Sequence, residues 1–188
     1  MVNKANQVRI ISGFLGGRKI QFPQHQDLRP TGDRAKETLF NWLNHSITNA
    51  RCLDCFAGSG SLGFEALSRG ASYVTFVEQD LTIAAALSAN IEKFSIQNST
   101  EIIIKNVVNY LKNTAQNKFD IVFLDPPYSL NLLDQIFTLL KNQRWISERT
   151  VIYYEDAKPL QVNVDDWQIL RQVKAGKVYF GIVTLASS

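Results

Sequence analysis

The sequence has 188 residues, of which 45% are hydrophobic, 20% charged and 11% aromatic. These values are typical of one packed domain and exclude a disordered or low-complexity chain. No apolar run approaches the roughly 18 residues that a membrane span requires, and the first residues are too polar for a secretory signal. We therefore expect a cytoplasmic protein that has no membrane partner.

The charge is unevenly distributed along the chain. The net charge is +3, but residues 1–40 carry +4 and the remaining residues carry −1. The basic residues of the first part are Lys4, Arg9, Arg18, Lys19, Arg29, Arg34 and Lys36. Such a basic end indicates an anionic partner, nucleic acid first, although charge alone slightly favours an ordinary solvated surface.

The first part of the chain predicts a small hairpin followed by a helix. Residues 8–12 and 18–22 are strand-like, and the glycines between them are Gly13, Gly16 and Gly17. Asp33 then stands where a helix N-cap is expected. The apolar residues on one face of that helix are Ala35, Leu39, Trp42 and Leu43.

Strand-like and helix-like stretches alternate from residue 51 onward. Strands are predicted over 51–56, 73–77, 101–104, 119–124 and 150–154. Helices are predicted over 61–69, 107–111 and 132–140, and after Asp80, which can act as an N-cap. Residues 167–172 and 178–185 then form an expected antiparallel pair. This order predicts an α/β fold with a doubly wound, mostly parallel sheet, whose ligands bind at the carboxyl ends of the strands.

Cys52 and Cys55 form a C-x-x-C motif within the first of these strands. Side chains three residues apart on a strand point to opposite faces, so the two thiols are expected to diverge. Neither His25 nor His45 has the spacing of a further metal ligand. We predict thiols packed in the core and no metal site.

A glycine-rich turn follows the same strand. Gly58, Gly60 and Gly63 form G-x-G-x-x-G, and Glu78 ends the next predicted strand, where an acid can hold a ribose diol. Two cofactors fit this pattern: a dinucleotide, with its pyrophosphate at the helix N-terminus, and S-adenosylmethionine, whose methionine part the glycines allow to approach the backbone. Asp54 can bind the ammonium group of the second cofactor, which favours the methyl donor.

The residues Asp125, Pro126, Pro127 and Tyr128 directly follow the apolar run 119–124. The prolines fix an extended backbone and donate no hydrogen bond, so the Asp125 carboxylate and nearby carbonyls remain as acceptors. Acceptors beside an aromatic ring suit a planar base with an exocyclic amine, on which Tyr128 can stack. We interpret these four residues as catalytic.

Together with the glycine motif, these residues resemble the amino-methyltransferases that use S-adenosylmethionine. Further segments are similar to the bacterial family that methylates a guanine of small-subunit ribosomal RNA at N2: 9–11 (RII), 17–19 (GRK), 28–31 (LRPT), 33–34 (DR), 37–43 (ETLFNWL) and 53–60 (LDCFAGSG). The similarity covers nearly the whole chain. Ser12 replaces a usual glycine of the family, and Gly16 replaces a frequent arginine that would contact phosphate.

The resemblance implies a Rossmann-like class I methyltransferase fold in one domain, with an N-terminal hairpin and helix extension over 1–46 and a catalytic core over 50–188. It implies S-adenosylmethionine as cofactor, and small-subunit ribosomal RNA within an assembled or assembling ribosomal particle as partner. Asn106 is expected to face the adenine. The implied cofactor-binding residues are Asp54, Phe56, Gly58, Gly60, Glu78 and Asn106, and the candidate RNA-binding residues are Arg18, Lys19, Arg29 and Arg34.

Other functions remain open at this point. An adenine-N6 methyltransferase acting on DNA or RNA could hold an adenine amine with the same four residues. A protein glutamine methyltransferase fits less well, because amide substrates are associated with Asn at the position of Asp125. A nicotinamide-dependent oxidoreductase would leave residues 125–128 unexplained, and a non-catalytic RNA-binding protein would keep the basic end without needing Asp125.

Overall fold

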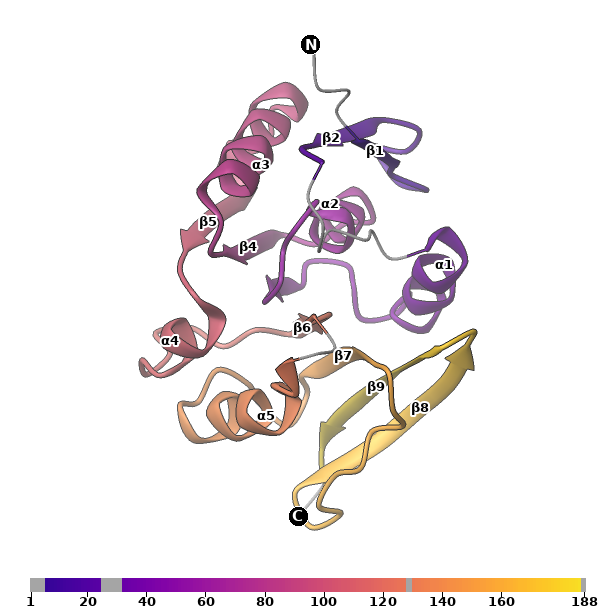
Figure 1. Ribbon diagram of the computed structural model, residues 1–188, viewed down its shortest axis with the longest axis vertical. Coiled ribbons are helices and arrows are strands. Elements are labelled where there is room, and N and C mark those ends of the chain that lie inside the picture. Colours follow the sequence, from indigo (N-terminus) through magenta and orange to yellow (C-terminus); the bar gives the residue numbers. More distant parts are fainter. Residues whose placement is uncertain (1–5, 25–31, 128–129, 187–188) are drawn as a thin grey trace.

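The computed structural model describes residues 6–24, 32–127 and 130–186. Its centre is a seven-stranded sheet in the order β5-β4-β3-β6-β7-β9-β8 (Figure 1). The parallel strands are β3 (Arg51–Asp54), β4 (Tyr73–Glu78), β5 (Thr100–Ile104), β6 (Ile121–Leu124) and β7 (Val151–Asp156). The antiparallel strands are β8 (Trp167–Ala175) and β9 (Val178–Leu185). The strand order reverses between β3 and β6, which is where such sheets bind their ligands.

Helices cover both faces of this sheet (Figure 1). One face carries α1 (Asp33–Trp42), α2 (Ser61–Ser68) and α3 (Leu81–Phe94), and the other carries α4 (Val107–Leu111) and α5 (Leu133–Asn142). A short 3-10 helix, Gln97–Ser99, precedes β5. Helices α2 to α5 each return the chain from the end of one parallel strand to the start of the next. The sheet therefore has a carboxyl end, where these strands finish, and an opposite amino end.

Alternation along the strands divides the buried side chains between two cores. Cys52 belongs to the core under α1, α2 and α3, whereas Cys55 belongs to the core under α4 and α5. Both thiols are free and buried, and they lie on opposite sides of the sheet as predicted. Among the described residues, no group of three His, Cys, Asp or Glu side chains is arranged to hold a metal ion.

The N-terminal hairpin packs against α3. Its strands β1 (Asn6–Arg9) and β2 (Lys19–Phe22) are antiparallel. The backbone N–H of Gln21 donates to Asn90 Oδ1 at 3.0 Å, and Asn90 Nδ2 donates to the Gln21 carbonyl at 2.7 Å. Hairpin, α1 and sheet share one hydrophobic core.

Helix α1 departs from the prediction in two respects. Gly32, rather than Asp33, occupies the N-cap, and Asp33 lies in the first turn, where its charge interacts favourably with the helix dipole. Lys36, counted above with the basic residues, is completely buried. Its ammonium donates to the carbonyl of Arg9 at 2.9 Å and to Ser61 Oγ at 3.1 Å. Lys36 therefore contributes nothing to a basic surface.

The first strand of the hairpin is predicted over 8–12 but spans Asn6–Arg9, because the N–H groups of Ile11 and Ser12 donate to Glu65 of α2 instead of to a strand. The remaining elements lie close to their predicted ranges. Asp80 caps α3 as predicted, because its Oδ1 accepts hydrogen bonds from the backbone N–H groups of Thr82 and Ile83. Strand β3 ends at Asp54, two residues earlier than predicted, because Cys55 already begins the glycine-rich turn. In the described part of the chain, no helix is both long and apolar enough to cross a membrane.

Candidate cofactor and catalytic site

The turn after β3 is anchored to both neighbouring strands. Asp54 is paired with Phe123 of β6 in the sheet register. The backbone N–H of Cys55 donates to the Phe123 carbonyl at 3.1 Å, and that of Ala57 donates to the Val77 carbonyl of β4 at 3.1 Å. These bonds hold the turn between the carboxyl ends of β4 and β6, at the point where the strand order reverses.

This turn requires its glycines. Gly58 and Gly60 have φ angles of 50° and 77°, in the left-handed region that favours glycine. A Cβ on Gly60 would also lie 2.5 Å from the Phe64 ring. At Gly63, a Cβ would lie 2.2 Å from the ring of Phe76, so this glycine allows α2 to pack directly on β4. The three motif glycines thus serve backbone conformation and close helix packing.

Asp54 is buried beneath the first turn of α2. Its Oδ2 accepts a hydrogen bond from the backbone N–H of Gly63 at 3.2 Å. Burial raises the pKa of Asp54 to about 7, and the negative charge of Glu78 adds to this shift, while hydrogen bonds from Gly63 and Phe56 oppose it. A carboxyl group in this environment is stabilised in its ionised form by a cation placed beside it.

Glu78 closes the turn on the side of β4. Its Oε2 accepts a hydrogen bond from the N–H of Gly58 at 3.0 Å, and its Oε1 accepts one from the N–H of Asp80 at 2.9 Å. The half-buried carboxylate therefore links the glycine turn to the start of α3. Each oxygen has a second lone pair, so the group can still accept hydrogen bonds from two adjacent hydroxyls.

Asn106 acts as the N-cap of α4. Its Oδ1 accepts hydrogen bonds from the N–H groups of Val108 at 3.0 Å and Asn109 at 3.4 Å, and its Nδ2 donates to Gln79 Oε1 at 3.2 Å. The resemblance implies that Asn106 faces the adenine, and the structure adds that its Oδ1 caps α4. Gln79 is a neighbouring polar group that sequence reasoning missed, although it directly follows Glu78.

Residues 125–127 continue β6 beyond the sheet. The last pair of the ladder joins Leu124 to Tyr154, and Asp125 follows directly at the carboxyl end of the sheet. Asp125 is half-buried, Pro126 is buried and Pro127 is exposed. Asp125 thus lies at the same end of the sheet as Asp54 and Glu78, on the next strand. Tyr128 lies outside the described residues.

Arg18 and Lys19 lie elsewhere. The Arg18 guanidinium is 5.8 Å from the centroid of the Phe94 ring, and Lys93 Nζ donates to the Lys19 carbonyl at 2.9 Å. Phe94 is the last residue of α3, which connects the end of β4 to the start of β5. The two basic residues therefore lie toward the amino end of the sheet, away from Asp125.

Arg34 lies closer to the glycine turn. It is exposed on the first turn of α1, beside Asp33, whose carboxylate is 3.7 Å from the ammonium of Lys36. That ammonium in turn bonds Ser61, the first residue of α2. Arg29 lies outside the described residues.

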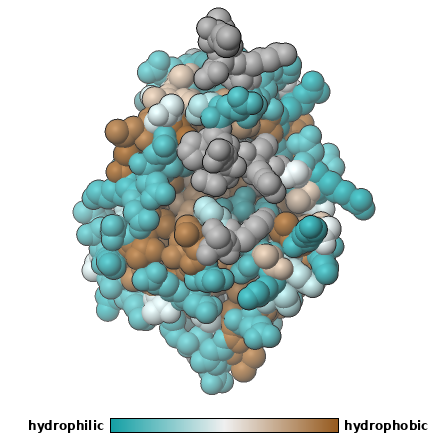
Figure 2. All heavy atoms as spheres, viewed as in Figure 1, coloured by the Kyte–Doolittle hydropathy of each residue, from teal (hydrophilic) through white to brown (hydrophobic). Residues whose placement is uncertain are grey.

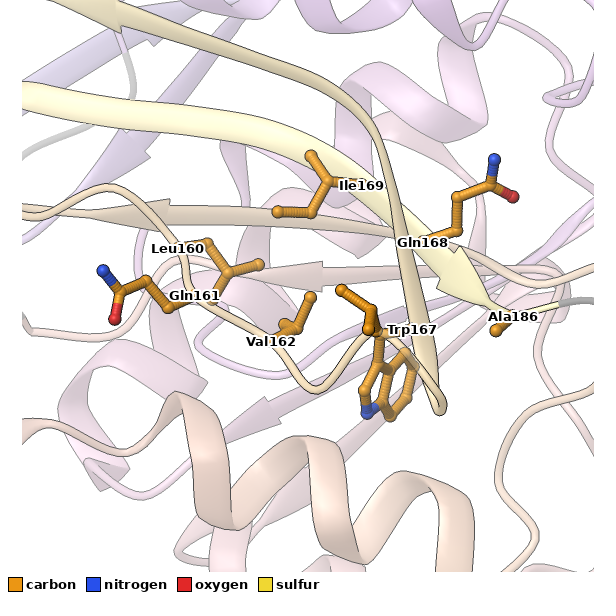
Figure 3. Close-up of a pocket in the computed structure, with 8 residues that line it drawn as sticks. Leu160, Gln161, Val162, Trp167, Gln168, Ile169 and Ala186 are labelled. Atoms are coloured by element: carbon orange, nitrogen blue, oxygen red, sulfur yellow. The ribbon is translucent and has the colours of Figure 1, made fainter.

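A separate hollow of about 750 Å³ opens where β8 begins (Figure 3). Its lining residues carry no ionisable side chain and are Leu160, Gln161, Val162, Val164, Trp167, Gln168, Ile169 and Ala186. Strand β9 is antiparallel to β7, so its last residue, Leu185, lies at the amino end of the sheet. Trp167 is paired with Leu185, and the hollow therefore lies at that end. It is remote from the strand ends that carry Asp54 and Asp125.

Comparison with known proteins places the chain among RNA-modifying enzymes. Residues 8–184 match the family described as "Conserved hypothetical protein 95". The chain is 44% identical over 182 residues to ribosomal RNA small subunit methyltransferase D of Haemophilus influenzae, covering 95% of this chain and 94% of that protein. The protein of the same name from Escherichia coli K12 is 40% identical over 180 residues, covering 94% and 89%. This chain belongs to that methyltransferase family.

Solved structures related to the family share the fold. A putative methyltransferase from Escherichia coli has a TM-score of 0.88 at 37% identity, with 97% of this chain and 100% of that chain covered. A putative methylase from Haemophilus influenzae has a TM-score of 0.83 at 39% identity, with 97% and 100% covered. A 16S rRNA N2 methyltransferase of Thermus thermophilus, solved with AdoMet and guanosine, shares the fold at 19% identity and a TM-score of 0.68, with 98% and 50% covered. The predicted family and fold class are confirmed.

Proposed function

We propose that this family member transfers a methyl group from S-adenosylmethionine to the exocyclic N2 amine of a guanine in small-subunit ribosomal RNA. The observation that carries the proposal is the meeting of Asp54, Glu78 and Asp125 at the carboxyl ends of three adjacent strands. The proposed class of RNA follows the small-subunit ribosomal RNA methyltransferases to which the chain is similar. The proposed chemistry is argued from the positions of these three carboxyl groups.

The site favours S-adenosylmethionine over a dinucleotide. A dinucleotide would bring its pyrophosphate to the N-terminus of α2. There, however, the N–H of Gly63 already donates to the carboxyl group of Asp54, and an ionised Asp54 would repel phosphate. The same carboxylate attracts an ammonium group. An S-adenosylmethionine site therefore agrees with the buried acid, whereas a pyrophosphate site does not.

Each group around the turn has a proposed role. Asp54 binds the ammonium of the cofactor, and Glu78 accepts hydrogen bonds from its ribose hydroxyls. Asn106 and the adjacent Gln79 lie at the carboxyl end of β4 and β5, on the adenine side. The residues that surround the methionine part are Phe56, Gly58 and Gly60.

The residues after β6 prepare the amine for attack. S-adenosylmethionine supplies an electrophilic methyl group on its sulfonium. The guanine amine is a weak nucleophile, because its lone pair is delocalised into the ring. The Asp125 carboxylate and the Pro126 carbonyl would accept its two N–H hydrogens, which favours a pyramidal nitrogen and aims its lone pair at the methyl group. Attack would form the N–CH3 bond as the S–CH3 bond breaks, S-adenosylhomocysteine would leave, and the methylated nitrogen would release one proton to solvent. Tyr128 stacks on the base in this proposal.

A base stacked in a helix cannot reach these acceptors. We therefore propose that the guanine is extruded or lies in a loop, and that stacking on Tyr128 replaces the contacts it loses. The substrate in this proposal is an assembled or assembling ribosomal particle in the cytoplasm.

The identity of the methylated nucleoside tests the proposal. Labelled S-adenosylmethionine is supplied with small-subunit particles, and the RNA is then digested to nucleosides. Label in N2-methylguanosine is the expected result. Label in N6-methyladenosine, or in protein, contradicts it. An Asp125→Ala protein prepared in parallel reveals any contaminating methyltransferase.

A further inference from the structure

The phosphates next to the target nucleotide need cations near Asp125. Phosphate contacts position a nucleic acid on a protein, so they must flank the base that enters the site. Arg18 and Lys19 lie toward the amino end of the sheet, whereas Asp125 lies at the carboxyl end. Of the candidate RNA-binding residues that the structure describes, only Arg34 lies nearer to the glycine turn, on the α1 side. Phosphates on the β7–β9–β8 side of the site would need other basic residues.

The β8–β9 hairpin brings lysines to the carboxyl end of the sheet. Strand β9 is antiparallel to β7, and Tyr179 of β9 is paired both with Asp156, the last residue of β7, and with Lys174 of β8. Lys174 is therefore level with the end of β7. Lys177 lies in the turn beyond it. In Figure 1 this tip of the yellow hairpin lies beside α1, in agreement with the 5.7 Å between the ring centroids of Trp42 and Phe180.

Lys158 is a third lysine on this side of the sheet. It follows β7, and its backbone N–H donates to Asp156 Oδ1 at 3.2 Å. Two residues later, the N–H of Leu160 donates to Gln172 Oε1 at 2.8 Å. Gln172 and Lys174 are two residues apart on β8 and share one face of the sheet. We call Lys158, Lys174 and Lys177 the basic rim.

The charge of the basic rim is largely uncompensated. All three lysines are exposed. The ion pairs found within residues 6–24, 32–127 and 130–186 involve Lys36, Arg69 and Lys141, and none includes a rim lysine. The acid beside them is Asp156, and the ammonium of Lys174 lies 5.1 Å from the Tyr179 ring centroid. Figure 2 shows mostly hydrophilic residues along the right edge of the molecule, the side on which Figure 1 draws the hairpin tip.

The sheet register sets the distance between the rim and the target. Strands β6, β7, β9 and β8 are successive neighbours, so β8 lies three spacings from β6. At about 4.8 Å for each spacing, this separation is roughly 14 Å. It corresponds to about four nucleotides at the roughly 3.4 Å rise of a stacked strand. The rim is thus within reach of phosphates near a guanine held at Asp125.

We propose that the basic rim binds phosphates of the RNA strand that flanks the methylated nucleotide. This inference rests on the proposed function and assigns the β7–β9–β8 side of the site to the incoming RNA. Contacts of this kind fix position and carry no sequence information. Strand β8 is at the edge of the sheet, where lysines can instead prevent pairing with the sheet of another molecule. In that case, removing them would cause self-association and leave RNA affinity unchanged.

The test compares two variants that lose the same charge. The test variant, Lys174→Gln/Lys177→Gln, removes two rim lysines. The control variant, Lys112→Gln/Lys118→Gln, removes two exposed lysines that lie after α4 and before β6, toward the amino end of the sheet. RNA affinity is measured across a salt series. We expect the rim variant alone to lose affinity and to flatten the logarithmic salt slope by roughly 1.4, at about 0.7 for each lost contact to a single strand. Cofactor affinity should match the unchanged protein.

Equal salt slopes in the two variants would overturn the proposal. So would a rim variant that self-associates in light scattering while its RNA affinity stays unchanged, because this indicates an edge-protecting role. Methylation by the unchanged protein is followed in the same samples. If that protein leaves the particle unlabelled, the proposed function fails; if it methylates the particle while the slopes are equal, the rim alone is wrong.

Discussion

At the scale of single residues, the buried carboxyl group of Asp54 lowers the stability of the folded protein when it is ionised. Burial raises its pKa from 3.8 to about 7. Between these two values the folded protein keeps a proton that the unfolded chain has released, so stability falls as the pH rises through this window. For a shift of about three units, the ionised carboxylate costs at most about 4 kcal/mol of folding free energy above pH 7. A bound ammonium group offsets this cost.

Replacing Asp54 by Asn should therefore stabilise the cofactor-free protein. Asn can still accept the hydrogen bond from Gly63, but it carries no charge to desolvate. We expect urea unfolding at about pH 8 to give a free energy of unfolding higher by about 1–3 kcal/mol, and the difference to vanish near pH 4. Cofactor affinity should fall at the same time. A variant that is less stable than the unchanged protein at pH 8 would contradict this account of Asp54.

Cofactor binding should depend on pH for the same reason. The ammonium group binds the ionised form of Asp54, so affinity should weaken below about pH 7, toward tenfold for each pH unit. It should also weaken above about pH 8, where the α-ammonium of the cofactor loses its own proton. Calorimetry in buffers of different ionisation enthalpy should detect proton release on binding at about pH 6. Asp54→Asn, the control, should bind weakly at every pH. Equal affinity of the unchanged protein at pH 6 and pH 8 would exclude Asp54 from the ammonium site.

At the scale of the elements, the buried ammonium of Lys36 links helix α1 to the end of the glycine turn. The ammonium of Lys36 bonds the carbonyl of Arg9, after which the chain leaves β1, and the hydroxyl of Ser61, which follows the last residue of the glycine turn. Glu65 of α2 accepts hydrogen bonds from the N–H groups of Ile11 at 2.7 Å and Ser12 at 3.1 Å. Burial lowers the pKa of Lys36, while the charge of Glu65 raises it. Hairpin, α1 and α2 thus depend on one another.

Lys36→Met should loosen this connection. The substitution keeps the length of the side chain but leaves the Arg9 carbonyl and the Ser61 hydroxyl without the donor that they have in the unchanged protein. We expect urea denaturation to show a loss of about 2–4 kcal/mol. The exposed control Lys112→Met should change stability by less than about 0.5 kcal/mol. If both variants unfold at the same urea concentration, the buried ammonium does not stabilise this junction.

Local patterns in the sequence predicted the elements better than the surfaces. The cap at Asp80 and the diverging thiols of Cys52 and Cys55 follow from spacing within a single element. The capping role of Asn106 could have been recognised in the same way, because Asn directly before a helix is a preferred N-cap. The burial of Lys36 could not, since its partners lie on other elements and a charge count does not distinguish buried lysines from exposed ones.

In the whole molecule, the sheet separates two tasks. Strands β3 and β4 end in Asp54 and Glu78, the proposed cofactor-binding residues, and β6 leads into Asp125, the proposed acceptor for the target amine. The switch in strand order brings the two halves together. This division could be expected from the alternating strands and helices. The position of Arg18 and Lys19 toward the amino end of the sheet could not be expected from the sequence, because it depends on how the hairpin packs on α3.

The most direct test of this division is a single-turnover assay of Asp125→Ala on small-subunit particles, with cofactor affinity measured on the same protein. We predict cofactor affinity within about twofold of the unchanged protein and methyl transfer slower by at least ~10²-fold, as expected when one preorganised electrostatic contact is lost. Glu78→Ala, the matched control, should show the reverse: weakened cofactor binding and nearly normal transfer at saturating cofactor. A folded Asp125→Ala protein that methylates guanine at the normal rate would contradict the account.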